Sequence, residues 1–187
     1  MIEREILNSD LDLFCLINNH PVHIASAGGY VPSIIMAEGY ISDYTKILKA
    51  LAKRWPVEDE IITNRELRYV IKYDENRENI HLILNTLFHN QTRGLSDEEL
   101  YNFYERKIYA HSFIEMARLG FLSYDKTNLG LPEDDAFHLV ARPRLFNSLI
   151  AQIFCITMRV PRFYIKNFNM GQRLILNSLS HNIYSYR

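Results

Sequence analysis

From residue 136 to residue 187 the sequence contains no aspartate and no glutamate. The same stretch holds 7 of the 21 basic residues, so its charge is +7. The first 135 residues hold the other 14 basic residues and all 22 acidic ones, a balance of −8. A nearly neutral chain is therefore divided into two oppositely charged parts, a pattern that indicates a charged partner.

Cysteine is scarce, and long apolar runs are missing. Cys15 and Cys155 each lie within a separate apolar segment, so we expect two free, buried thiols and no disulfide. The most apolar window, 145–160, is short and interrupted by polar residues, which excludes a membrane-spanning helix. The first five residues lack the features of a secretory signal, and the expected location is the cytoplasm.

Several catalytic and metal-binding motifs are also absent. The chain has no P-loop, no GxGxxG, no HExxH, no paired cysteines and no G-x-S-x-G sequence. One E-x-x-H pair, Glu78 and His81, falls short of the two that a di-iron bundle needs, so the seven histidines are interpreted as hydrogen-bonded side chains. No motif points to a particular cofactor, and we favour a protein that is not an enzyme.

What is present predicts an α+β fold that is predominantly helical, with five to seven helices and an N-terminal β-hairpin. An all-α fold with a short hairpin is the alternative. The hairpin is expected from the two apolar runs 11–18 and 22–27, and a short strand from 137–141. The chain is expected to form one domain over 1–187; if a subdomain boundary exists, it falls in 121–135, a segment that we interpret as a surface loop.

The helices are predicted from apolar residues at steps of three and four, from capping residues and from prolines. The longest is expected to begin at the capping box of Ser96 and Glu99 and to end before Gly120. Apolar residues surround the segment 80–88, which predicts a central helix. The other helices are expected near 34–55, 63–71, 143–154 and 174–183.

Two segments could bind a ligand. Gly28 and Gly29 follow a predicted strand and precede a predicted helix, an order that suits an anion cradle, with His20 or His23 as a general base. This would make the chain a small enzyme or a binding protein for a phosphorylated or carboxylate metabolite. An ordinary turn with a hairpin histidine explains the same residues. Ser26 and His23 as a nucleophile and base lack a third, orienting group.

The second segment is a basic cluster around Pro161, formed by Arg159, Arg162 and Lys166 with the aromatic Tyr164. Arginine binds carboxylates and phosphates through two parallel hydrogen bonds. The cluster predicts a binding or regulatory module that engages an acidic partner, either another protein or a second copy of the chain. Nucleic acid is less favoured because the whole chain is near neutral. Pairing of these charges with the acidic part of the same chain is the competing interpretation.

Overall fold

A mixed β-sheet of seven strands forms the centre of the protein. The computed structural model describes residues 11–26, 41–63, 80–82, 84–127, 136–166, 168–170 and 174–175. Strand order is β3-β5-β4-β2-β1-β6, and β7 also pairs with β5. The strands are β1 (Asp12–Ile17), β2 (His20–Ala25), β3 (Ile61–Thr63), β4 (Leu122–Lys126), β5 (Ala136–Pro143), β6 (Arg162–Phe163) and β7 (Leu174–Ile175).

The predicted N-terminal hairpin is present as β1 and β2, with Ile17 paired to His20. Asn18 and Asn19 form its two-residue turn, and both have positive φ angles of 49° and 65°. Asparagine tolerates this conformation better than most residues, and such turns match the twist of paired strands. The hairpin lies in the middle of the sheet, because β2 pairs in parallel with β4 and β1 in parallel with β6.

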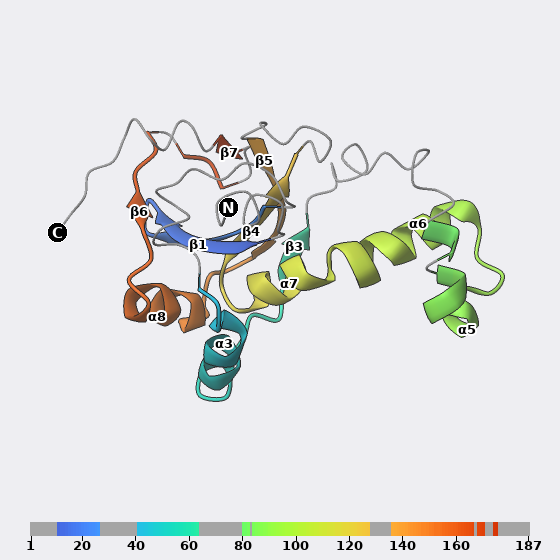
Figure 1. The fold of residues 1–187 in the computed structure, drawn as a ribbon, viewed down its shortest axis with the longest axis horizontal. Coiled ribbons are helices and arrows are strands. Elements are labelled where there is room, and N and C mark those ends of the chain that lie inside the picture. Colours follow the sequence, from blue (N-terminus) through green and yellow to red (C-terminus); the bar gives the residue numbers. More distant parts are fainter. Residues whose placement is uncertain are drawn as a thin grey trace, which may run out of the picture.

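Apolar side chains cover both faces of the sheet. On one face, Leu13, Cys15 and Ile17 belong to a core cluster that also includes Tyr124 and Phe137. The other face is packed against helices. These helices are α3 (Tyr44–Ala52), α7 (His111–Arg118) and α8 (Ile150–Thr157), which lie below the sheet in Figure 1.

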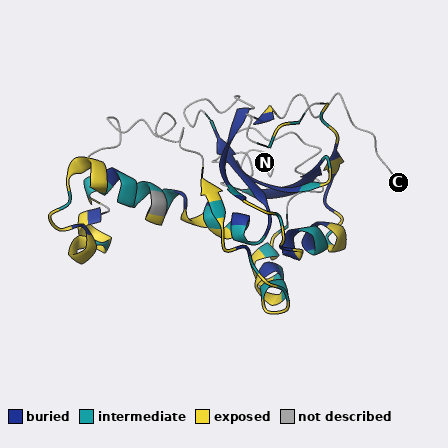
Figure 2. Ribbon diagram, turned by 180° about the vertical axis from the view of Figure 1, so that it is seen from behind, coloured by how far each residue is buried: buried dark blue, intermediate teal, exposed yellow. Residues whose placement is uncertain are grey.

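A helical arm extends from this layer away from the sheet (Figure 1). We define the arm as residues 84–109, which include α5 (His89–Thr92), α6 (Asp97–Tyr104) and the π-helical turn η2 (Glu105–Tyr109). The capping box predicted for Ser96 and Glu99 is confirmed. Only Tyr109 of the arm belongs to one of the three core clusters of the described residues. Figure 2 shows the arm mostly as intermediate and exposed surface.

The predicted fold class was wrong, because the protein is not predominantly helical but is built on a large mixed sheet. The segment 121–135 was interpreted as a loop, yet residues 122–126 form a buried central strand. Residues 174–175, expected at the start of a helix, form a strand. The segment after Pro143 is not helical until residue 150, so the helix predicted from 143 begins later. Local sequence could not reveal these strands because their partners are distant in the chain.

Candidate functional site

Polar side chains from three neighbouring strands meet on the helix-covered face of the sheet. His23 of β2 is directly beside Ser123 of β4, and it pairs on its other side with Phe14 of β1. Asp12 is two residues before Phe14 and therefore points to the same face. The sheet register thus brings together three polar residues that are up to about 110 positions apart in the sequence.

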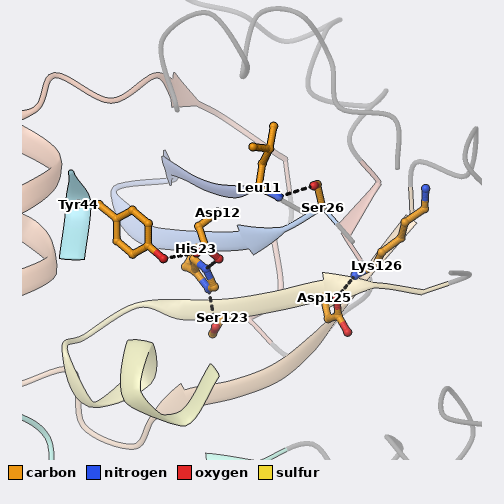
Figure 3. A network of polar contacts seen from close by, with 8 residues as sticks. All are labelled: Leu11, Asp12, His23, Ser26, Tyr44, Ser123, Asp125 and Lys126. Carbon is orange, nitrogen blue, oxygen red and sulfur yellow. Dashed lines mark hydrogen bonds and ion pairs between the residues drawn. The ribbon is translucent and has the colours of Figure 1, made fainter. Parts of the chain in front are cut away.

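These residues form a continuous hydrogen-bonded chain (Figure 3). The Nδ1 atom of His23 lies 2.7 Å from the hydroxyl oxygen of Ser123, and Nε2 lies 2.7 Å from Oδ1 of Asp12. Tyr44, at the start of α3, donates its hydroxyl hydrogen to the other carboxylate oxygen of Asp12. The chain of contacts therefore links α3 to the centre of the sheet.

Burial and charge set the protonation of Asp12. Its side chain is 32% exposed, whereas that of His23 is 2% exposed. Burial alone raises the pKa of Asp12, but the hydrogen bond and charge of His23 and the hydrogen bond from Tyr44 together lower it below its ordinary value. Asp12 is therefore held as a carboxylate that accepts hydrogen bonds from both neighbours.

The order Ser123, His23, Asp12 resembles the connectivity of a catalytic triad, but its burial argues against nucleophilic catalysis. Ser123 is completely buried, and the most exposed member is Asp12. A nucleophile must reach its substrate, but the hydroxyl of Ser123, which would attack, is not accessible from solvent. Ser26, the other serine considered with His23, instead accepts a hydrogen bond from the backbone N–H of Leu11 at 2.9 Å.

A second, shorter polar contact lies on the same face. Tyr109 of η2 donates its hydroxyl hydrogen to Asp125 of β4, two residues after Ser123 on the same strand. Burial is the largest cause that raises the pKa of Tyr109, and the charge of Asp125 adds to it. In Figure 3 Asp125 and its neighbour Lys126 point to opposite faces of the sheet, as consecutive strand residues do.

Next to the His23 network, a mostly apolar pocket of about 360 Å³ lies between α3 and α7. Tyr44 lines it, so the same side chain forms part of the pocket wall and begins the buried polar chain. The charged residues that line it are Lys49, Glu115 and Arg118. The last two form an ion pair of 3.4 Å.

The basic cluster lies at the β6 edge of the sheet, on β6, on the turn that precedes it and on the residues that follow it. Arg159, Arg162 and Lys166 are exposed, and Tyr164 is 57% exposed. Phe163, between two of them, is buried, so the alternation of a strand directs its neighbours outward. Arg159 has a φ of 54°, a left-handed conformation that is costly for residues with a Cβ atom.

The structure brings the four residues of the basic cluster together on one exposed segment. Among the described residues, no ion pair involves Arg159, Arg162 or Lys166. Arg144 of the same acid-free region does pair, with Glu60 at 2.8 Å. Among the described residues, internal pairing thus accounts for Arg144, and pairing of the cluster with acidic residues outside these ranges stays the competing interpretation.

The described residues include only part of the other predicted site. Gly28 and Gly29 lie outside the described residues, so the anion cradle stays a prediction. His23 is buried with both ring nitrogens engaged, an arrangement that leaves neither nitrogen facing a ligand. No group of three or more potential metal ligands occurs in the described part of the chain.

No protein-family model, no curated protein and no solved structure matches this chain. Within the described ranges, no helix is both long and apolar enough to cross a membrane.

Sequence reasoning missed Asp12, Tyr44 and Ser123. The hairpin itself carried a signal for the first of these. A two-residue turn at Asn18 and Asn19 fixes the register of the strands, and that register places Asp12 diagonally opposite His23 on the same face. Tyr44 and Ser123 gave no comparable signal, because they reach His23 only through tertiary packing.

Proposed function

We propose that this chain is a non-enzymatic binding module whose basic cluster engages an acidic protein partner. One observation carries the proposal: Arg159, Arg162 and Lys166 are exposed together and lack ion-pair partners among the described residues. Arginine side chains that surround an exposed tyrosine are typical of binding surfaces, where tyrosine supplies contact area and arginine supplies bidentate hydrogen bonds.

The backbone at the cluster adds to this argument. Arg159 keeps a left-handed conformation although it is not a glycine. The N–H of Arg159 donates to the oxygen of Ile156 at 3.3 Å and that of Val160 to the oxygen of Cys155 at 3.1 Å, the hydrogen bonds of a Schellman helix end. This helix end fixes the backbone between α8 and β6, the segment that carries Arg159.

The test is binding of a fluorescein-labelled octaglutamate peptide, followed by fluorescence anisotropy. We expect the affinity to fall as salt rises, because exposed charges are screened. The double variant Arg159→Ala/Arg162→Ala should weaken binding by about tenfold or more, since each lost charge-assisted contact contributes on the order of 1 kcal/mol.

The matched control is Lys53→Ala/Arg54→Ala, which removes two exposed basic residues at the end of α3. We expect this variant to bind like the wild type. Binding that is insensitive to salt, or equally weakened by both double variants, would refute the proposal. A single-stranded oligonucleotide of equal charge that binds more tightly than the peptide would identify nucleic acid as the partner instead.

A further inference from the structure

The two ends of the molecule carry complementary surfaces. One end consists of α8 and β6 with the basic cluster, and the other is the tip of the arm, at the opposite side of Figure 1. Each exposes large apolar side chains to solvent and lies beside charges of one predominant sign. An apolar surface beside charges of opposite sign at the two ends suits contact between copies of the chain.

The basic end has an apolar stripe on α8. Ile150, Ala151, Phe154 and Cys155 face the core, while Leu149 is 55% and Ile156 is 59% exposed. Residues seven positions apart lie on the same side of a helix, so the exposed pair forms one stripe. Arg162 follows the last residue of this helix by five positions, at the start of β6.

The tip of the arm presents an apolar groove of about 340 Å³ along α6. Leu95, Glu99, Asn102, Phe103 and Lys107 line this groove. Leu82 and Leu87, which precede α5, are 66% and 69% exposed. The segment 80–88 was predicted to be a central helix, but only Ile80 and Leu84 of it are buried among the described residues.

Acidic residues begin the same helix. Asp97, Glu98 and Glu99 occupy the exposed first turn of α6, where the helix dipole favours negative charge. Arg93 and Lys107 are exposed basic residues of the arm, before and after this turn. The acidic turn belongs to the part of the chain whose charge is −8, and the basic cluster belongs to the part whose charge is +7.

The helices at the two ends also match in length. α6 and α8 each contain 8 residues, a length of about 12 Å at 1.5 Å per residue. Two such helices can pack along their whole length, with apolar side chains at the centre and opposite charges at the rim.

We propose that the chain associates head to tail with a second copy of itself. The arm of one copy docks its groove on the α8 stripe of the next, and the acidic turn of α6 contacts Arg159 and Arg162. This inference rests on the proposed function, whose acidic partner it identifies. An interface between two different surfaces is heterologous, so assembly proceeds beyond a dimer to a ring or a filament.

The test measures molecular mass by size-exclusion chromatography with light scattering, over a range of protein concentrations. At low salt, about 50 mM, we expect the mean mass to rise with concentration, and at about 500 mM salt we expect it to fall toward that of one chain. Arg159→Glu/Arg162→Glu and Asp97→Lys/Glu98→Lys should each be monomeric. Lys53→Glu/Arg54→Glu makes the same change in charge on α3 and should assemble like the wild type.

Combining the two reversals in one chain should restore assembly, because the charges are then exchanged between the two ends. Circular dichroism checks that every variant is folded. The milder pairs Arg159→Ala/Arg162→Ala and Asp97→Asn/Glu98→Gln replace any variant that is not.

Mixed with each other, these milder variants should form a 1:1 dimer and nothing larger, since each retains one functional end.

A wild-type chain that remains monomeric at low salt overturns the inference, as does assembly that persists in both reversed variants. Either result leaves the binding module intact if octaglutamate still binds at the basic cluster. A wild-type chain that does not bind octaglutamate, and whose assembly persists in both reversed variants, would refute the proposed function and this inference together.

Discussion

At the scale of single residues, hydrogen bonds explain how polar side chains can be buried between the sheet and its helices. His23 lies in a nearly dry environment, and a buried polar group without a partner would cost about 1–3 kcal/mol. Asp12 and Ser123 each satisfy one ring nitrogen, and Tyr44 satisfies the second oxygen of Asp12. The network is therefore complete, and its members depend on one another.

Replacement of Asp12 by asparagine should destabilise the protein by about 1 kcal/mol at neutral pH, because the charged acceptor for His23 and Tyr44 is lost. The pKa of Asp12 is lowered in the folded state, so its contribution is present above the unfolded pKa and is lost as pH falls through the folded pKa. The difference between wild type and Asp12→Asn should be constant from about pH 5 to 7 and should narrow below about pH 4.

Urea unfolding at several pH values measures this difference. Asp43→Asn, at an exposed carboxylate paired with Lys46, is the control and should have little effect. A gap between wild type and Asp12→Asn that widens as the pH falls would contradict the assigned charge state.

Among the elements, the connection from α7 to β4 depends most on one residue. α7 ends at Arg118, and Gly120 follows with a φ of 103°, which confirms the predicted helix end. A Cβ atom on Gly120 would lie 3.1 Å from the backbone oxygen of Ser148. The tight turn directs Phe121 and Leu122 into the core, both fully buried.

Gly120→Ala should therefore destabilise the protein by about 2 kcal/mol or more, from strain at positive φ combined with close contact to a backbone atom. Gly94, before α6, also has a positive φ, of 83°, but nothing lies within 4 Å of the position that a methyl group would take there. Gly94→Ala should cost only about 1 kcal/mol. Thermal unfolding of both variants tests the comparison, and equal losses would show that the contact with Ser148 contributes nothing.

At the scale of the whole molecule, the sheet separates the apolar core on one face from that on the other. One cysteine is buried in each. Cys15 belongs to the cluster on one face, and Cys155 to the cluster on the helix-covered face. Both thiols are free and buried, as predicted from their apolar surroundings. Burial raises the pKa of each thiol, that of Cys155 to about 12.

We expect both thiols to react with a disulfide reagent only when the protein unfolds as a whole, at a rate at least about 10³-fold below that of the unfolded chain. The measurement is the rate of thiol labelling across a range of urea concentrations that keep the protein folded. The labelling of both thiols should accelerate in parallel. One thiol that reacts rapidly in native buffer would show that its face of the sheet opens independently.

Prediction from sequence was most accurate where local chemistry decides structure. The Ser96 capping box, the glycine at position 120 and the pairing of the two hairpin runs all depend on residues a few positions apart. The turn itself was expected at 19–21 and lies at Asn18 and Asn19. It was least accurate for β4, where buried residues pair with strands about 14 and 100 positions away. The exposed leucines of the arm show the same limit, because an apolar segment does not reveal what it packs against.

The sequence by itself determined the charge division, the free thiols, the hairpin, the capping box at Ser96 and the helix end before Gly120, because each follows from composition or from neighbouring residues. Only the tertiary structure decided that the hairpin is the middle of a mixed sheet, that His23 is enclosed by Asp12 and Ser123, and that the basic cluster is exposed. Strand pairing and burial join residues that are distant in the chain, so their outcome depends on the packing of the whole molecule.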